Sequence, residues 1–244
     1  MRYLINFSYD GSNFDGYQKQ PNCKSIQQNI EHNLSIILQE NIKIHASGRT
    51  DKGVHAINAY AHFDILEEIV NINKVKKSLN SMVDDAIYIK SIVNVDYNFH
   101  ARYNVIKKVY EYKINTGCYN PFQRNYIYQY NKKLNLKKME ECFTYLIGIH
   151  DFKSFVSSDK DIKNFTKNIY KIDVNILNDI ITITFEGNGF LKHQIRNMMG
   201  TVLTIIQKDL NSNIMEEILK SKDRRNAFIK ISSVGLYLKD VYYK

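Results

Sequence analysis

The sequence predicts an α+β fold in which two tandem ferredoxin-like (split βαβ) halves, residues 1–104 and 105–244, form one central antiparallel sheet. The main observation is the order of the expected elements, which is β-α-β-β-α-β in the first half and nearly the same, with longer connections, in the second. The composition agrees, because 44% of the 244 residues are hydrophobic and only 2 are Pro, which excludes a disordered or fibrous chain. We expect helices on one face of the sheet and a basic cleft on the other.

Apolar residues at helical or alternating spacing define the elements of the first half. Ser25 and Gln28 form a capping box at the start of the first helix, in which Ile26, Ile30 and Leu34 follow helical spacing. The turn-forming residues 48–53 separate the second strand from the third. The expected strands are 2–9, 42–47, 54–65 and 87–95, and the expected helices are 25–39 and 73–82.

The second half has longer connections between its elements. Asn178 and Asp179 interrupt two alternating runs and predict a hairpin, and Gly148 is expected just past the end of a helix. The expected strands are 105–115, 169–177, 180–185 and 236–243, and the expected helices are 136–147, 190–206 and 214–221.

The chain is basic, with 34 Lys and Arg against 25 Asp and Glu and a formal net charge of +9. The excess is concentrated between Arg102 and Lys138, where nine cations accompany one acid, Glu111. Such an excess is typical of a polyanion-binding protein, and nucleic acid is the first candidate. A solvated cationic face is an equally good interpretation of charge alone, because the chain is rich in Lys.

Cysteine usage and hydropathy exclude several other classes. Cys23, Cys118 and Cys142 are odd in number and far apart, so neither a disulfide framework nor a zinc site is supported, and we expect no metal. The N-terminus lacks the apolar stretch of a signal peptide, and no segment approaches 18 uncharged apolar residues. We therefore expect a cytoplasmic protein that does not contact a membrane.

Asp51 is the clearest candidate for a reactive group. It lies between Arg49 and Lys52 in the tight connection from Gly48 to Gly53. A carboxylate beside a guanidinium stays ionised, which suits a nucleophile. An Asp in such a turn also commonly hydrogen-bonds its own backbone, so the spacing leaves both interpretations open. His55, four residues further on, is more typical of a structural residue than of a catalyst.

Cations and aromatics alternate from Arg102 to Tyr112. Lys107 and Lys108 precede Tyr110 and Tyr112, which share one face of a predicted strand. Tyrosine rings stack on unstacked bases, and lysines bind phosphates. For either tyrosine alone, packing against the sheet with its hydroxyl in water is an equally good interpretation.

A third candidate segment runs from Gly187 to Gly200. Its glycines lead through Lys192 and His193 into a helix whose N-terminus can attract an anion. Arg196 interrupts the apolar pattern of that helix, and a buried guanidinium needs an acid or a phosphate as its partner. Asp51 is an attractive partner for it. The Gly-x-Gly-x-x-Gly fingerprint of dinucleotide-binding proteins is absent from the sequence.

Six segments, taken together and in this order, resemble the motifs of the tRNA pseudouridine synthase A family. The resemblance runs through nearly the whole chain, and the second segment matches the family's Gly-Arg-Thr-Asp-x-Gly-Val-His motif. The six segments are residues 9–20, 47–56, 99–114, 148–155, 187–200 and 235–238.

The resemblance implies a role for each candidate. By position, Asp51 is the catalytic aspartate, Tyr110 lies under the target uracil, Arg196 pairs with Asp51, and Arg49 helps to flip the base. The family breaks the N1 glycosidic bond of uridine, turns the uracil and rejoins it through C5, without a cofactor. Asp51 would attack C1′ of the ribose or remove a proton from C2′, and addition to C6 of the uracil is an older proposal. The sequence leaves all three routes open.

The resemblance also implies a partner and an assembly. The expected substrates are uridines at positions 38–40 in the anticodon stem-loop of tRNAs, and the expected assembly is a homodimer. The +9 charge then serves RNA binding. The expected RNA-binding residues are Arg49, Arg102, Lys107, Lys108, Lys192 and His193.

A few residues depart from the family pattern and keep alternatives open. Tyr17 and Tyr128 stand where the family usually has Trp, Gln129 replaces a usual His, and Ser232 and Ser233 precede the last motif where Ala and Pro are common. The alternatives are the same isomerisation on another RNA, such as ribosomal RNA, and a non-catalytic RNA-binding helper.

A hydrolytic glycosidase is disfavoured. Such enzymes need two carboxylates at a set separation, and Asp151, the nearest second candidate, fits the opening of a strand better.

Overall fold

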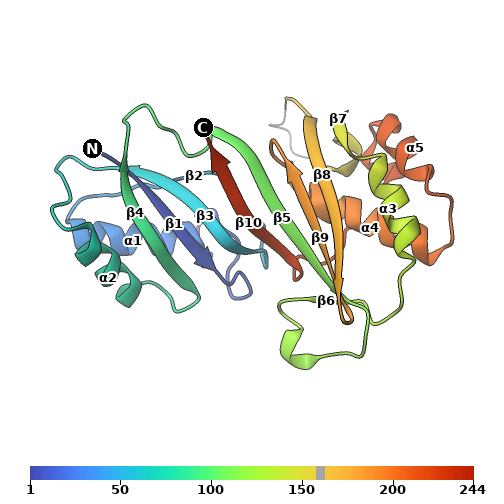
Figure 1. Cartoon of the computed structure of the whole chain (residues 1–244). Helices are drawn as coiled ribbons and strands as arrows, with labels where there is room; N and C mark the ends of the chain where they lie inside the picture. Colours follow the sequence, from blue (N-terminus) through green and yellow to red (C-terminus); the bar gives the residue numbers. More distant parts are fainter. Residues whose placement is uncertain (158–162) are drawn as a thin grey trace. The chain divides into compact units, whose positions relative to one another are not determined.

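The computed structural model describes residues 1–157 and 163–244, and within them ten strands and five α-helices alternate (Figure 1). Strand pairing is mostly antiparallel. The chain divides into two compact units, Met1–Ile106 with Tyr237–Lys244, and Lys107–Leu236. The predicted α+β class with a mainly antiparallel sheet is confirmed. The basic cleft expected on the face of the sheet opposite the helices stays a prediction.

The first unit has the strand order β4-β1-β3-β10, with β2 added beside β3. The central strand β1 is antiparallel to both of its neighbours, and β10 is parallel to β3. The strands are β1 (Arg2–Tyr9), β2 (His45–Ala46), β3 (His55–Asp64), β4 (Ile87–Val95) and β10 (Leu236–Tyr243), and the helices are α1 (Ile26–Leu38) and α2 (Ile72–Met82).

Helix α1 begins and packs as its sequence predicts. The Ser25 side chain accepts a hydrogen bond from the Gln28 N–H at 3.3 Å, and such a cap stabilises a helix by about 1 kcal/mol. The apolar stripe of Ile26, Ile30 and Leu34 is fully buried together with the β1 residue Phe7. Removing these side chains from water fixes the helix against the sheet of its own unit.

The second unit has the strand order β5-β9-β8-β7, with β6 parallel to β5. The predicted hairpin is confirmed as β8 and β9, and Asn178 at its turn has a φ of 55°. The strands are β5 (Val105–Asn115), β6 (Tyr128–Gln129), β7 (Gly148–Asp151), β8 (Thr166–Leu177) and β9 (Ile180–Gly187), and the helices are α3 (Leu136–Thr144), α4 (Gln194–Gln207) and α5 (Ile214–Ser221).

Two helices depart from their predicted bounds by three or more residues at one end. Helix α3 ends at Thr144, before the expected limit of 147, and Gly148 begins the strand β7 with a φ of 105°. Helix α4 begins at Gln194 rather than 190, because Gly189 and His193 both have positive φ angles, 152° and 64°. Left-handed backbone cannot belong to an α-helix, so the helix starts after them.

The strand expected over 42–47 is reduced to the two residues of β2. Ile42 and Ile44 are buried, as an apolar alternation predicts. Their N–H groups, however, donate to side chains of α1: Ile42 to Ser35 Oγ at 2.9 Å, and Ile44 to Glu31 Oε1 at 3.0 Å. Backbone donors that are satisfied by a helix are not available to a strand ladder.

The last strand, β10, was expected in residues 105–244, but residues 237–244 pack with the first unit. Tyr237 and Leu238 pair with His55 and Ala56 of β3, and the Tyr243 hydroxyl donates to the Ala101 carbonyl at 3.0 Å. Alternation in a sequence predicts a strand but does not specify its neighbour.

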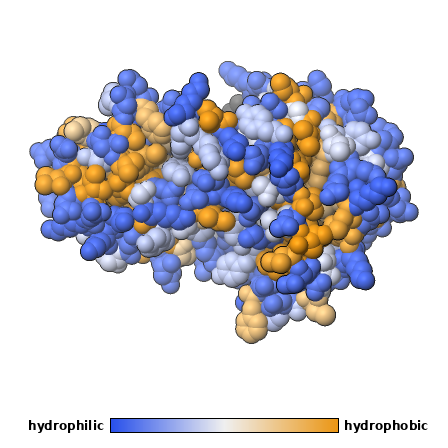
Figure 2. Space-filling view, in the orientation of Figure 1, coloured by the Kyte–Doolittle hydropathy of each residue, from blue (hydrophilic) through white to orange (hydrophobic). Residues whose placement is uncertain are grey.

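Figure 2 shows a largely hydrophilic surface with an apolar strip over β8 of the second unit. Ile176 and Leu177, at the end of that strand, are 45% and 71% exposed. Among residues 1–157 and 163–244, no helix is long and apolar enough to cross a membrane.

Candidate active site

Asp51 lies in the connection between β2 and β3 and is half-buried. Its carbonyl oxygen accepts a hydrogen bond from the Val54 N–H at 3.1 Å, and Gly53 inside this turn has a φ of 76°. A left-handed glycine lets the chain reverse within four residues. Asp51 is therefore presented from a tight turn at the start of a long central strand.

The segment that follows β1 packs against this turn. The Tyr17 N–H donates to the Thr50 carbonyl at 3.1 Å. Gly11 lies so close to the turn that a Cβ atom there would be 2.1 Å from the Val54 carbonyl oxygen. The first two motifs, which are about 40 residues apart in the sequence, thus form one local structure within the first unit.

A hydroxyl pair connects β1 to the residue next to Asp51. Tyr9 Oη and Thr50 Oγ1 are 2.7 Å apart, and the Tyr9 ring stacks on Phe7 at 6.1 Å between centroids. Neither hydroxyl was a candidate in the sequence, although both residues belong to the quoted motifs. Their contact joins residues 41 positions apart, so no local sequence pattern predicts it. The sequence points to these two residues only in that both belong to motifs of the same family.

His55 has a structural role, as favoured from its sequence context. Its side chain is buried, and its Nδ1 accepts the Gly11 N–H at 3.2 Å. The same nitrogen lies 3.1 Å from Asp10 Oδ1, and the ring stacks on Tyr237 at 4.7 Å. These contacts hold the opening motif against the start of β3.

The charges beside Asp51 differ in their surroundings. Lys52 donates to Asp15 Oδ1 at 2.8 Å, which lowers the pKa of the Asp15 carboxyl and raises the pKa of the Lys52 ammonium. Arg49 is exposed. Tyr17 is buried, and burial raises the pKa of its phenol well above the ordinary value, with Arg49 opposing the shift. Lys52 is therefore engaged in a surface ion pair, and Arg49 is also exposed to solvent.

Tyr110 and Tyr112 lie on one face of β5, as predicted, but in different environments. Tyr110 is half-buried and packs edge-to-face on Phe190 with centroids 5.3 Å apart. Tyr112 is 0% exposed, and its hydroxyl donates to the Ser232 carbonyl at 2.8 Å. Burial also raises the pKa of the Tyr112 phenol well above its ordinary value. Tyr112 is therefore a core residue, and Tyr110 is the accessible ring.

Arg196 lies in the first turn of α4 and is half-buried. Its Nε donates to the Ile231 carbonyl at 2.9 Å, and its own carbonyl accepts the Ile231 N–H at 3.4 Å. These two bonds orient the guanidinium from the backbone of the second unit. The expected pairing of Arg196 with Asp51 joins residues of different units and stays a prediction.

Four of the expected RNA-binding residues belong to one region of the second unit. The register of β5 and β9 places Lys108 opposite Gly187, so Lys107 and Lys108 lie beside the segment that leads to Lys192 and His193. Lys107 also forms an ion pair with Glu186 at 3.0 Å, and His193 Nδ1 contacts Ser157 Oγ. Lys192 is exposed.

Arg102 belongs to the first unit, as does Arg49. It is exposed, and its guanidinium lies 5.8 Å from the centre of the Tyr103 ring. In the parts of the chain that the structure describes, no group of three or more His, Cys, Asp or Glu side chains is placed to hold a metal ion.

Comparison with known proteins gives a consistent result over the full length. A family model described as tRNA pseudouridine synthase matches residues 5–104 and 143–244. The curated tRNA pseudouridine synthase A of Limosilactobacillus reuteri (strain DSM 20016) is 39% identical over 99% of this chain and 96% of its own length. The proteins of the same name from Mycoplasma genitalium and Streptococcus agalactiae serotype III are 38% and 37% identical over 100% of this chain and 99% and 95% of their own lengths.

Proposed function

The chain belongs to the tRNA pseudouridine synthase family, an isomerase family, and on this premise we propose that it converts uridine to pseudouridine at positions 38–40 in the anticodon stem-loop of tRNA. The observation that carries this proposal is the full-length similarity, which includes every candidate segment. Asp51 and Arg196 lie inside the ranges of the family model. Tyr110 lies between those ranges, inside alignments that cover the whole chain.

Asp51 acts as an ionised carboxylate in the proposed reaction. In one route its oxygen attacks C1′ while the C1′–N1 bond breaks and the uracil leaves with the bonding pair. In the other it removes the C2′ proton as that bond breaks, and later returns the proton. In both, C5 of the turned uracil bonds to C1′. In the first route this displaces the Asp51 oxygen, so the ester bond to C1′ breaks and the carboxylate is restored. C5 then loses its proton and N1 gains one. All atoms are conserved, so the reaction is an isomerisation, and the proposal includes no cofactor.

Tyr110 and Arg196 support this step from the second unit. The edge-to-face contact with Phe190 fixes the Tyr110 ring, which we assign as the surface under the uracil. The Ile231 carbonyl fixes Nε of Arg196, and the rest of the guanidinium is assigned to pair with the Asp51 carboxylate.

RNA binding supplies the free energy that exposes the target base. Extruding a base from a helical stack costs a few kcal/mol, and phosphate contacts can offset that cost. We assign Arg49 to the flipped nucleotide. The cations Arg102, Lys107, Lys108 and Lys192, together with His193, are assigned to the RNA backbone.

The departures from the family pattern do not favour another RNA. Tyr17 is buried against Phe7, and the Tyr128 ring lies 6.2 Å from the core residue Tyr112. The Gln129 side-chain oxygen accepts hydrogen bonds from Asn115 and from the Asn120 N–H. All three side chains make internal contacts, so their substitution is compatible with the same substrate.

The test is a pseudouridine map made with purified protein. Transcripts of one tRNA that carry a single uridine at position 38, 39 or 40 are compared with a transcript that has cytidine at all three positions, and with a ribosomal RNA fragment. We expect pseudouridine in the three uridine transcripts alone. Modification of the ribosomal fragment, with none in the tRNAs, would contradict the proposed substrate.

We also propose that the enzyme is a cytoplasmic homodimer. The tRNA substrate supports the location, and the resemblance to the family supports the assembly. Light scattering should give twice the 28.7 kDa mass of the chain, and a monomer mass would contradict the dimer.

A further inference from the structure

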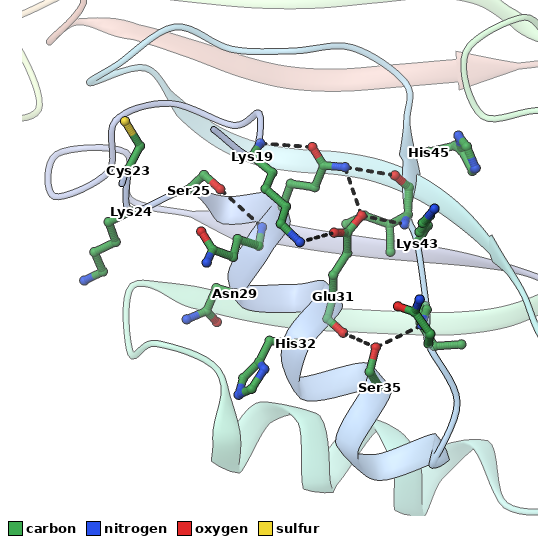
Figure 3. A pocket seen from close by; sticks show the side chains of 15 residues that line it. Lys19, Cys23, Lys24, Ser25, Asn29, Glu31, His32, Ser35, Lys43 and His45 are labelled. Atoms are coloured by element: carbon green, nitrogen blue, oxygen red, sulfur yellow. Dashed lines mark hydrogen bonds and ion pairs between the residues drawn. The ribbon is translucent and has the colours of Figure 1, made fainter. Parts of the chain in front are cut away.

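A groove of about 860 Å³ lies on the first unit, alongside α1 and outside the Asp51 turn (Figure 3). Its lining comes from Lys19 and residues 23–25 before α1, from α1 residues 27–29, 31, 32 and 35, and from residues 41–45. Lys19, Lys24 and Lys43 supply cations, and Gln28 and Asn41 supply side-chain amides. Cations and amides are the side chains that most often contact phosphate and sugar groups of nucleic acids.

Glu31 is the single carboxylate among the lining residues, and it forms hydrogen bonds within the protein. Glu31 is only 7% exposed. Its Oε1 accepts hydrogen bonds from Gln27 Nε2 at 2.9 Å and from the Ile44 N–H at 3.0 Å, and Lys19 Nζ lies 3.9 Å from its Oε2. Lys24 forms an ion pair with Asp84 at 2.6 Å. Lys43 is exposed, and the Lys19 side chain is 59% exposed with only the long 3.9 Å contact to Glu31, so these two lysines are the best placed to meet an anion from solvent.

The groove leads to a row of four rings. His45 lines the groove and stacks on His62 at 5.0 Å between centroids, with the planes 22° apart. His62 meets His100 at 4.5 Å, and His100 meets Tyr103 at 4.2 Å. Both ends of the row are exposed, Tyr103 by 75%, and Arg102 lies over the Tyr103 ring. The His62–His100 contact is edge-on, with the planes 64° apart, so the rings form a connected row with an exposed aromatic ring at either end.

The inner imidazoles are neutral near pH 7. Burial, with Arg2 and the neighbouring histidines, lowers the pKa of His62 to about 4. Burial, His45 and Arg2 also lower the pKa of His100. A neutral imidazole behaves as an aromatic ring rather than as a cation, so the interior of the row favours stacking over ion pairing.

We propose that this groove and ring row form a second RNA-binding surface, which holds an unpaired segment of the substrate RNA with phosphates on Lys19 and Lys43 and unstacked bases on His45 and Tyr103. A cationic groove that leads to exposed aromatic rings is the arrangement with which proteins hold single-stranded nucleic acid. The inference rests on the proposed function only in taking RNA as the substrate.

The test measures binding rather than activity, so that it stands apart from the assignment of Asp51. Fluorescent oligouridine, an RNA duplex of the same charge and a tRNA transcript are titrated with the intact protein over a range of salt concentrations. The charge variant is Lys19→Gln with Lys43→Gln. Its matched control is Lys74→Gln with Lys77→Gln, two exposed lysines of α2 that do not line the groove.

The charge variant should bind oligouridine about 5- to 10-fold more weakly, and the slope of log Kd against log salt should fall by about 1.4, the value for two phosphate contacts on a single strand. The control pair should change oligouridine affinity by less than about twofold, since surface lysines outside a binding site contribute little. Unchanged affinity and slope in the charge variant would overturn the proposal. An equal loss of duplex binding would also overturn it, because it would indicate general attraction to RNA.

Two substitutions at Tyr103 test the contribution of the ring row to RNA binding. Tyr103→Ala should weaken oligouridine binding about 5-fold or more with an unchanged salt slope, because stacking carries no counterion release. Tyr103→Phe keeps the ring and should bind like the wild type, and Tyr103 is exposed, so both variants should fold. Wild-type binding by Tyr103→Ala, or a loss in Tyr103→Phe equal to that in Tyr103→Ala, would remove the ring row from the proposal.

Discussion

At the scale of single residues, the proposed chemistry depends on how firmly the Asp51 turn is held. The turn is attached to β1 by the hydroxyl pair of Tyr9 and Thr50, and to the following segment by the bond from Tyr17 to the Thr50 carbonyl. Both contacts end on the residue directly before Asp51. A small displacement of a catalytic group lowers the rate steeply, so these contacts should affect turnover more than binding.

Tyr9→Phe removes one hydroxyl of this pair and keeps the ring. We expect kcat to fall about 3- to 10-fold with KM for tRNA nearly unchanged, because the turn loses one positioning bond. Steady-state kinetics with a tRNA transcript gives both constants. The matched control is Tyr88→Phe, at an exposed tyrosine of β4, which should behave like the wild type. A raised KM with unchanged kcat in Tyr9→Phe would contradict a positioning role.

His62 gives a prediction about stability and pH. Its pKa is about 4 in the folded protein and close to 6.5 when unfolded, so the unfolded state binds more protons between these values. Stability is therefore complete above pH 6.5 and declines as the pH falls towards 4. Allowing for solvent screening, the wild type should lose about 1–2 kcal/mol of unfolding free energy through this site.

The measurement is urea unfolding at pH 7 and pH 4.5. His62→Asn retains an acceptor for the Ala101 N–H, which donates to His62 Nδ1 at 3.2 Å, but it cannot titrate. Its stability should depend less on pH than that of the wild type. His32→Asn, at an exposed position of α1, is the control and should keep the wild-type dependence. Equal pH dependence in all three proteins would contradict the role of His62.

The sequence singles out Asp51, Tyr110 and Arg196 as candidates, but it gives no sign of the residues that surround them. Asp51 lies in a short motif whose spacing is visible in the chain, whereas the contact of Tyr9 with Thr50 joins residues 41 positions apart. Tyr110 and Tyr112 occupy equivalent positions in the alternating pattern of one strand. Only the structure shows that Tyr112 is buried and Tyr110 is accessible. The burial of a side chain depends on which elements pack over the strand, and the alternation of residues along the strand does not specify those elements.

At the scale of elements, local sequence signals predicted correctly that most of the helices and strands exist, but they predicted the first and last residues of those elements less well. The capping box of α1 and the hairpin turn at Asn178 are local interactions, and both are confirmed. The shortened β2 depends on Glu31 and Ser35, which bind backbone donors 13 and 7 positions away. A period-2 pattern contains no information about such donors, so the strand was predicted too long.

Glu31→Ala tests that explanation. The change leaves the buried Ile44 N–H without its acceptor and the Gln27 amide with only its 3.5 Å contact to the Ile44 carbonyl, which should lower the free energy of unfolding by about 2 kcal/mol. Urea denaturation at pH 7 measures the loss. Glu140→Ala, at an exposed glutamate of α3, should stay within about 0.5 kcal/mol of the wild type. A loss no larger than that of Glu140→Ala would show that Glu31 does not hold this segment.

At the scale of the whole molecule, the α+β class followed from the order of the elements, but the place of the last strand did not. Residues 237–244 follow the second unit in the chain, yet they pair with β3 of the first. The ends of the chain therefore both belong to the unit that carries Asp51. Strand pairing over nearly 200 positions is decided by tertiary packing, which alternation along the chain cannot express.

The central claim is that Asp51 carries out the isomerisation, and single-turnover kinetics tests it most directly. Asp51→Asn is compared with Asp173→Asn, at a largely exposed β8 carboxylate that pairs with Lys171. Tritium release from tRNA labelled at C5 of uridine should fall at least about 10³-fold in Asp51→Asn, with tRNA affinity within about twofold of the wild type. Asp173→Asn should react at the wild-type rate. Release at the wild-type rate by Asp51→Asn would contradict the claim.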